Sequence, residues 1–247
     1  MATFVKYTAK LTVFSSAMLL LASCGFGGSK PVPSANIDRS VQTKSIFSLP
    51  RLGLPTFGGS AYRGSGLSAE EQQCRIQLKR LGVAFEDVAP IRESESCGIN
   101  NPVKVSSLAR GVALTPAATL NCQTALASAQ WLQNDAGPAA RSRYLSGIAE
   151  VRQLSSYSCR RIGGDGKWSE HSIGNALDIG SFKLNNGRKI DVARPSFFAM
   201  REKSFLTSVR GQACGRFGTV LGPGDKDHHD HFHFDLRERS QTYCSMK

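Results

Sequence analysis

Six cysteines spread between residues 74 and 244 limit the fold of this chain more than any other feature. They are Cys74, Cys97, Cys122, Cys159, Cys214 and Cys244, and a seventh, Cys24, lies near the N-terminus. In an exported protein an even number of cysteines indicates disulfide bonds, whereas in the cytosol cysteines more often bind metal or react. No two of them form a Cys-x-x-Cys pair, which disfavours a cysteine metal site. The compartment therefore decides how these residues are interpreted.

The N-terminal segment indicates export. Lys6 and Lys10 precede an apolar run, residues 11–21, that is too short to span a bilayer. We therefore predict that residues 1–23 are a signal peptide and that the remaining six cysteines form disulfides. Fifteen pairings are possible, and we expect pairing in sequence order because each pair would then flank a compact unit. The expected bonds are Cys74–Cys97, Cys122–Cys159 and Cys214–Cys244.

The end of the signal, "LASC" at residues 21–24, resembles the bacterial lipobox. By that resemblance Cys24 would carry the lipid and become the mature N-terminus, on the periplasmic side of the cell envelope. Gly25 follows in place of an Asp, which in the enterobacterial sorting rule favours the outer membrane. Several acyl chains together anchor a protein stably. The alternative is an ordinary secretory signal with a chance cysteine.

The charge is strongly basic. The 247 residues carry a net charge of +12, and the signal contributes two lysines and no acid, which leaves about +10 (12 − 2) for the mature chain. For an exported protein the expected acidic partners are peptidoglycan and anionic lipid. The chain has none of the usual nucleic-acid motifs, so we expect no nucleic-acid partner. A solvated basic surface without a partner is the alternative.

The composition divides the chain into a tether and a domain. Residues 24–66 are rich in Gly, Ser and Pro and predict a flexible tether, and residues 67–247 predict the folded domain. Ser68 and Glu71 form a capping box for a first helix, which Gly82 would end. Thr115 and Pro116 suit the N-cap and first position of a second helix.

The second half of the domain predicts strands. We expect strands at "VRQLSSYSCRRI" and "RFGTVLG", a hairpin from "NALDIGSFKL" and "RKIDVA", a helix opening after Pro195, and a last strand at "DHFHFDL". Helices that come first and antiparallel strands that follow indicate an α+β fold. We therefore predict a small antiparallel sheet with flanking helices, linked by disulfides.

The histidines are concentrated in one run. Four of the five lie in "HHDHFHFDL", residues 228–236, and the fifth is His171. On a strand with period two, His231, His233 and Asp235 share one face, and the phenylalanines between them point to the other. We expect the apolar face to pack on the core and the polar face to line a cleft.

These residues predict a zinc centre. A catalytic zinc needs three protein ligands and one open position. One imidazole of the His-x-His pair can bind metal while the other stays near it. His171 and Asp178 can supply the other two ligands, and Gly174 between them allows the backbone to turn. A His-x-His pair alone is as often a solvated strand face, but the upstream His and Asp strengthen the prediction of bound Zn²⁺.

The segment "SEHSIGNALD", residues 169–178, resembles the Ser-x-His-x-x-Gly-x-Ala-x-Asp motif of the LAS zinc peptidases. This group includes D-Ala-D-Ala carboxypeptidases, murein endopeptidases and the hedgehog N-terminal domain, and its second motif can be His-x-His, as in "HFH" here. Residues from about 74 to 244 more closely resemble the bacterial extensin-like C-terminal domain, through "SYSCRRI", "SEHSIGNALDIG", "VLGPG" and "DHFHFDL". The resemblance implies a LAS/hedgehog-like zinc peptidase fold.

The resemblance also implies roles. His171, Asp178 and His233 would bind zinc. His231 would act as the general base, taking a proton from zinc-bound water and later returning it. Ser169 would hold a ligand or the edge of the cleft by hydrogen bonding.

Arg160 or Arg161 occupies the place of an arginine that LAS peptidases use near their substrate, where it could hold a peptide carboxylate. Surface charge is an equal alternative for both. Asp230 and Asp235 can orient imidazole N–H groups, although Asp235 could instead pair with an arginine. His228 and His229 have no assigned role.

Two classes of function remain. The first is a zinc-dependent peptidase, either an endopeptidase or a carboxypeptidase, that cleaves peptidoglycan stem peptides or cross-links in the envelope. The second is a non-catalytic zinc module that binds peptidoglycan or a partner protein. A structural site has no need of His231 beside His233, so this pair favours the enzyme. A metal-storage surface built from the histidine run is a weaker third possibility.

Overall fold

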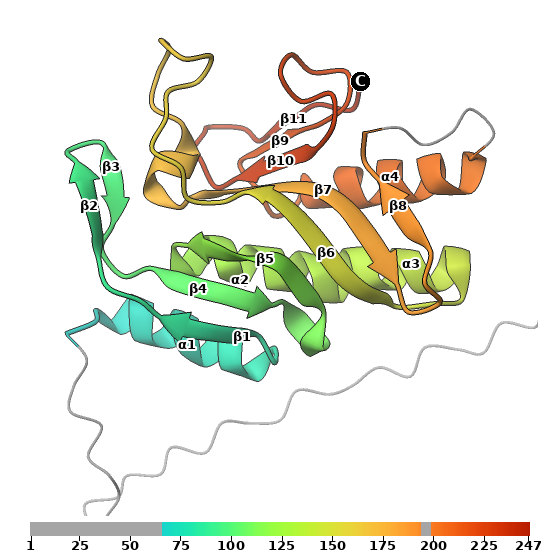
Figure 1. The fold of residues 1–247 in the computed structure, drawn as a ribbon, viewed down its shortest axis with the longest axis horizontal. Helices are drawn as coiled ribbons and strands as arrows, with labels where there is room; N and C mark the ends of the chain where they lie inside the picture. Colours follow the sequence, from blue (N-terminus) through green and yellow to red (C-terminus); the bar gives the residue numbers. More distant parts are fainter. Residues whose placement is uncertain (1–65, 194–198) are drawn as a thin grey trace, which may run out of the picture. The chain divides into compact units, whose positions relative to one another are not determined.

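The structure, a computed structural model, describes residues 66–193 and 199–247, which form an α+β domain (Figure 1). The predicted signal peptide, Cys24 and nearly all of the predicted tether lie outside the described residues. The strands are β1 Ala84–Asp87, β2 Ile91–Ser94, β3 Cys97–Ile99, β4 Val103–Ser107, β5 Ala113–Leu120, β6 Ile148–Ser155, β7 Ala176–Leu184, β8 Lys189–Asp191, β9 Thr219–Leu221, β10 Phe232–Asp235 and β11 Tyr243–Cys244. The α-helices are α1 Ala69–Arg80, α2 Cys122–Trp131, α3 Gly137–Tyr144 and α4 Met200–Ala213. Across the described ranges, no helix has the length and apolar character needed to cross a membrane.

The main sheet has nine strands, in the order β1-β4-β5-β6-β7-β10-β9-β11, with β8 paired to β7. Strands β2 and β3 form a separate hairpin. β5 pairs with β6 in parallel, as β11 does with β9, whereas the other neighbours are antiparallel. The predicted α+β class is therefore confirmed, but the predicted small antiparallel sheet is wrong. α2 and α3 form the crossover that a parallel β5–β6 pair requires.

The predicted helix start at Thr115 and Pro116 is also wrong, because both residues lie in β5. Pro116 follows the last residue of β5 that pairs with β6, and it falls where the β4 register shifts. Its missing N–H therefore removes no ladder hydrogen bond. α2 begins later, at Cys122, where the Asn121 side chain accepts a hydrogen bond from the backbone N–H of Thr124 at 2.8 Å.

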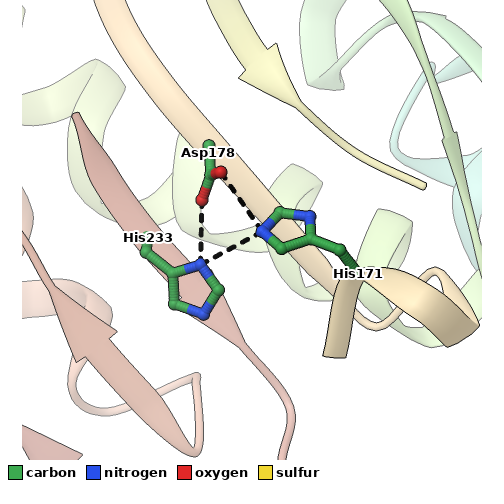
Figure 2. A group of neighbouring side chains, drawn as sticks. All are labelled: His171, Asp178 and His233. Carbon is green, nitrogen blue, oxygen red and sulfur yellow. Dashed lines mark hydrogen bonds and ion pairs between the residues drawn. The ribbon is translucent and has the colours of Figure 1, made fainter. Parts of the chain in front are cut away.

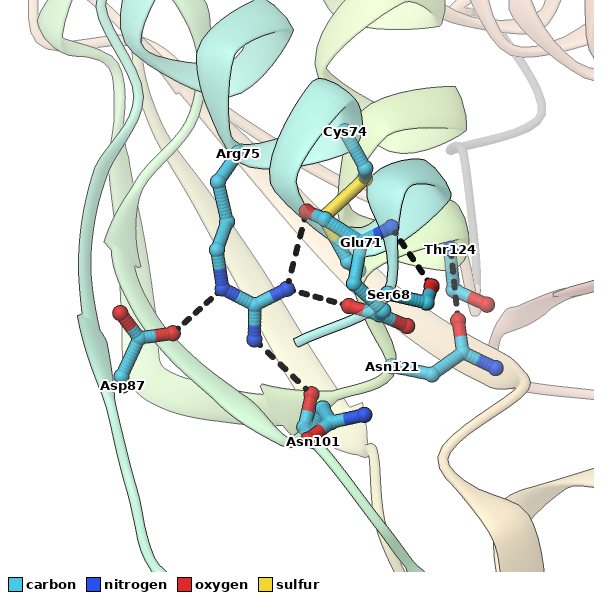
Figure 3. The surroundings of a disulfide bond; sticks show 9 residues. Ser68, Glu71, Cys74, Arg75, Asp87, Asn101, Asn121 and Thr124 are labelled. Carbon is cyan, nitrogen blue, oxygen red and sulfur yellow. Dashed lines mark hydrogen bonds and ion pairs between the residues drawn. A yellow bond between two sulfur atoms is a disulfide. The ribbon is translucent and has the colours of Figure 1, made fainter. Parts of the chain in front are cut away.

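The first helix matches its prediction at both ends. The Ser68 hydroxyl accepts from the Glu71 backbone N–H at 3.3 Å, and Gly82 adopts φ +71° just after the helix. The Glu71 carboxylate bonds to the buried Arg75 (Figure 3). Arg75 also donates to Asp87 in β1 at 2.6 Å and to the Asn101 carbonyl at 3.2 Å, so it joins α1 to the sheet.

The three disulfides link elements that are distant in sequence. They are Cys74–Cys122, Cys97–Cys159 and Cys214–Cys244, so the first two predicted pairings are wrong and the third is confirmed. The first bond joins α1 to the start of α2, and the second joins β3 to the loop after β6 (Figure 3 shows the first). Sequence order fails because these partners meet only through the packing of separate elements.

The remaining predicted elements are present with shifted bounds. β7 and β8 form the predicted hairpin, and β9 and β10 lie where short strands were expected. α4 begins at Met200, and residues 194–198 before it are outside the described ranges. β10 is not the last strand, because β11 follows it.

The core lies between the helices and the sheet. The Trp131 ring of α2 meets Phe234 of β10 edge-on at 5.3 Å, and Phe205 of α4 meets Phe182 of β7 in the same way at 5.3 Å. All four rings are fully buried. The Trp131 indole donates to the Val209 carbonyl of α4 at 3.0 Å, which satisfies its N–H. One face of β7 and β10 is thus fixed by helices, and the opposite face is left for polar residues.

Candidate metal centre

Asp178 and His233 are brought together by strand pairing. β7 and β10 are antiparallel, and these two residues are direct partners in the register. Side chains of directly paired residues lie on the same face of a sheet, and the Asp178 Oδ1 atom lies 2.8 Å from His233 Nδ1. The alternation predicted for β10 is present, since Phe232 and Phe234 enter the core while His233 and Asp235 line a cavity.

His171 reaches the same point from a short 3₁₀ helix, Glu170–Ile173. The Ser169 hydroxyl caps this helix by accepting from the His171 backbone N–H at 3.3 Å. Gly174 ends the helix at φ +65° and turns the chain into β7. An added Cβ at Gly174 would lie 2.3 Å from Ile99, so only glycine fits.

The hydrogen-bond partners of His171 and His233 determine which ring nitrogen of each carries the hydrogen. His171 Nδ1 lies 2.6 Å from the Ser156 carbonyl, which can only accept, so Nδ1 carries the hydrogen. His171 Nε2 then presents a lone pair, 3.2 Å from His233 Nδ1 and 3.2 Å from Asp178 Oδ2 (Figure 2). His233 Nε2 donates to Asp235 at 2.9 Å, which leaves Nδ1 for the cluster. Asp235 therefore orients an imidazole N–H group, that of His233, which is one of the two alternatives predicted for it from the sequence.

The three side chains fit a metal ion. They are all buried, and one potential ligand atom from each lies within 4.8 Å of the others. Two imidazole nitrogens and one carboxylate oxygen are a donor set that zinc accepts. Each histidine is also oriented through its other nitrogen, as is usual for metal-binding histidines.

The electrostatics of the metal-free cluster are those of a buried ion pair. Burial alone would raise the pKa of Asp178, but its hydrogen bonds and charge contacts with His171 and His233 lower it well below the usual range. Burial alone would lower the pKa of His233, but Asp178 and Asp235 outweigh this and raise it to about 9. Without metal, a proton on His233 Nδ1 therefore sits where a cation would bind.

His231 lies beside the cluster without belonging to it. Its Nδ1 donates to Asp230 at 2.7 Å, and its Nε2 lies 3.8 Å from Asp178 Oδ2. The hydrogen bond from His231 lowers the pKa of Asp230, which keeps that carboxylate ionised. With Nδ1 engaged by Asp230, the His231 Nε2 atom is the one that faces the three-residue cluster.

The two candidate arginines differ. A cavity of about 220 Å³ contains the cluster, and both Arg160 and Arg161 line it. An Nη of Arg160 lies 3.4 Å from Asp178 Oδ2. The Arg161 guanidinium instead lies over the Trp168 ring, 4.4 Å from its centre, and donates to the Gly166 carbonyl at 3.0 Å. Arg160 is thus the arginine next to the cluster, and Arg161 is at the rim.

The two histidines without a predicted role, His228 and His229, differ in their surroundings. His228 lines the cavity, and its ring centre lies 5.2 Å from that of His231 and 5.4 Å from that of His233. Burial lowers the pKa of His228, so its ring is neutral at pH 7. His229 is exposed to solvent.

Several residues that line the cavity were not predicted, among them Thr219, Arg237 and Arg239. The period-two pattern contains a signal for the two arginines. His231, His233 and Asp235 are followed at the same spacing by positions 237 and 239, and all five line the cavity. Thr219 comes from β9, the register partner of Asp235, and no local pattern marks it.

The fold and the cluster define a disulfide-linked α+β domain with a possible His₂Asp metal site. Residues 72–245 match the model of a family described as "Extensin-like protein C-terminus". The chain belongs to this family. A search of curated proteins and a search of solved structures give no match.

Proposed function

We propose that this domain is a zinc-dependent peptidase that hydrolyses amide bonds of peptidoglycan stem peptides or cross-links. The observation that carries the proposal is the placement of His231. Its Nε2 lies 3.8 Å from the carboxylate of the three-residue cluster, but the ring takes no part in it. A purely structural metal site needs no such free base. The resemblance of residues 169–178 and 231–233 to the LAS zinc peptidases supports zinc as the ion and a related fold.

The residues would divide the work as follows. His171, Asp178 and His233 would hold the ion, which when bound supplies Lewis acidity that polarises an amide carbonyl and makes water more acidic. His231 would accept a proton at Nε2 from the attacking water and return it to the leaving amine. Asp230 would hold the His231 tautomer and stabilise its protonated form.

Substrate would be held by cations at the cavity. The half-exposed Arg160 lies next to Asp178, where its guanidinium can bind a carboxylate of the peptide. We also propose that the protein acts on the periplasmic side of the envelope, held at the outer membrane by lipid on Cys24. The net positive charge of the chain would attract it to acidic peptidoglycan.

The test is metal content and hydrolysis of purified muropeptides by the wild type and two variants. His171→Ala should lose both metal and activity. His231→Ala should keep its zinc and lose about 10²–10⁴-fold in kcat, because only the base is removed. His229→Ala is the matched control, since this histidine is exposed, and it should behave as wild type. A wild type that binds no zinc and leaves the muropeptide profile unchanged would refute the proposal.

A further inference from the structure

The arginines that line the cavity around the cluster are not all paired with its acids, which are Glu170, Asp178, Asp227 and Asp235. Four arginines line the cavity: Arg160, Arg161, Arg237 and Arg239. Arg237 is paired with Glu170 at 2.7 Å, and Arg160 lies near Asp178. Among the residues that the structure describes, Arg161 and Arg239 have no carboxylate partner. Glu238, the residue before Arg239, is exposed and does not line the cavity, and Asp235 is engaged by His233.

Arg239 is held in a defined orientation. Its Nε donates to the Thr219 hydroxyl at 3.1 Å, and its guanidinium carbon lies 5.7 Å from the centre of the Tyr243 ring. Thr219 is in turn the register partner of Asp235, and both residues line the cavity. Within the described ranges, neither Nη of Arg239 has a hydrogen-bond partner. The two Nη groups form part of the planar fork that binds a carboxylate with two parallel hydrogen bonds.

Arg239 lies on the opposite side of the metal cluster from Arg160 and Arg161. Its partner Thr219 is in β9, whereas the other two arginines follow β6. The sheet order β6-β7-β10-β9 places the two ligand-bearing strands between them. Three strand spacings correspond to about 14 Å, which an extended peptide of about four residues can span.

We propose that Arg239 binds a carboxylate of the substrate on the β9 side, so that the cavity selects peptides with carboxylates on both sides of the hydrolysed amide. The position of that amide rests on the proposed function, whereas the binding of the acid does not. The substrate class is a short acidic peptide that lies across the strands rather than along them. Arg239 is a specificity-determining residue in this arrangement, and Arg160 and Arg161 bind the acid at the other end.

The first experiment compares two synthetic stem peptides of four residues. One carries free carboxylates on both sides of the central amide, and in the other the carboxylate on the β9 side is converted to an amide. Arg239→Ala should raise KM for the diacid roughly 10- to 100-fold, as expected for a lost charged hydrogen bond, with a smaller change in kcat. The same variant should change KM for the amidated peptide by less than about threefold. Arg80→Ala, an exposed arginine at the end of α1, is the matched control.

A charge-reversal variant distinguishes a lost binding contact from a general failure to fold, because it should gain a new preference. Arg239→Glu should prefer a peptide with a lysine in place of the β9-side acid, and zinc content and thermal unfolding should stay at wild-type values. If Arg239→Ala weakens both peptides equally, or neither, or if Arg239→Glu gains no preference for the lysine peptide, the proposal is overturned.

Calorimetric binding separates this proposal from the proposed function. In a His231→Ala background, the diacid should bind more tightly than the amidated peptide, and the added Arg239→Ala change should abolish that difference. If the wild type hydrolyses neither peptide while this difference is present, the peptidase proposal fails and the anion site stands. If hydrolysis occurs and the difference is absent, the anion site fails alone.

Discussion

The Nε2 atom of His233 lies 2.9 Å from a carboxylate oxygen of Asp235, two residues further along β10. The alternation of the strand places both side chains on one face, and both are buried. Asp235 thereby fixes the hydrogen of His233 on Nε2 and leaves Nδ1 to face Asp178 and His171. One residue of a four-residue strand thus orients another towards the His171–Asp178–His233 cluster.

Replacing Asp235 should weaken metal binding without removing a ligand. We expect Asp235→Asn to lower zinc affinity by about 10- to 100-fold, because the negative partner of a ligating histidine is lost. Competition with a chromophoric chelator measures the affinity. Asp230→Asn is the matched control, since its partner His231 is not a ligand, and it should lower kcat while zinc affinity is retained. Equal losses of affinity in the two variants would contradict these roles.

Gly174→Ala should destabilise the domain and disturb the metal centre. The new Cβ would meet Ile99 at 2.3 Å and the Asn121 backbone nitrogen at 2.9 Å, in addition to the cost of φ +65°. We expect a loss of about 3 kcal/mol or more in the free energy of unfolding, measured by denaturant titration. Gly187→Ala has a similar φ of +82° but open space around it, so it should lose only about 1–2 kcal/mol. Equal losses would show that backbone strain alone matters.

Removing the Cys97–Cys159 disulfide should affect both stability and substrate binding. The bond closes a separation of 62 residues, and its second cysteine immediately precedes Arg160. The double change to serine should cost about 2–5 kcal/mol in stability and raise KM, because the loop that carries Arg160 is released. The same change at Cys74 and Cys122, 48 residues apart, should lower stability by a similar amount and leave KM unaltered. Steady-state kinetics well below the unfolding temperature tests the difference.

Asp225 should make the stability of the domain depend on pH. Burial alone would raise its pKa, but the Ser245 hydroxyl, the Gly222 backbone N–H, Arg210 and Lys247 together lower it. Since the folded pKa lies below the unfolded value, the stabilisation is present above about pH 4 and is lost as pH falls through the folded pKa.

Asp225→Asn should therefore cost about 3–5 kcal/mol at pH 7, because it leaves the buried Arg210 without its charge partner. Its deficit relative to wild type should shrink as the pH falls below 4, measured by denaturant titration across pH. Asp191→Asn, in an exposed pair with Lys189, should cost less than about 1 kcal/mol throughout. A deficit for Asp225→Asn that stays constant down to pH 2 would contradict the assignment.

Local sequence signals predicted the parts of the fold that local interactions determine. Ser68 and Gly82 marked both ends of α1, and the alternation around His233 placed the phenylalanines in the core. Thr115 and Pro116 gave a false helix start, because the same two residues also fit a strand. Only pairing with β4 and β6 distinguishes the strand from the helix, and both of these strands come from other parts of the chain.

The candidate site was predictable to the extent that it follows a repeating pattern. His171, Asp178 and His233 meet as the motifs suggested, and extension of the period-two pattern would have added Arg237 and Arg239. Two disulfides could not be paired correctly, because α1 and α2, like β3 and the loop after β6, become neighbours only in the folded domain. Which of Arg160 and Arg161 faces Asp178 likewise depends on Trp168, which holds the second guanidinium.

Because β10 lies between β7 and β9, the three candidate ligands come together only late in the folding of the chain. His171 and His233 are 62 residues apart, and the strand that carries His233 is among the last to be synthesised. The growing chain exposes His171 and Asp178 first, and two such ligands without the third hold a metal ion poorly. A metal ion held by all three side chains would therefore bind only after β10 has paired with β7. A chain that ends before β10 lacks His233 and would offer a metal only two of the three candidate ligands.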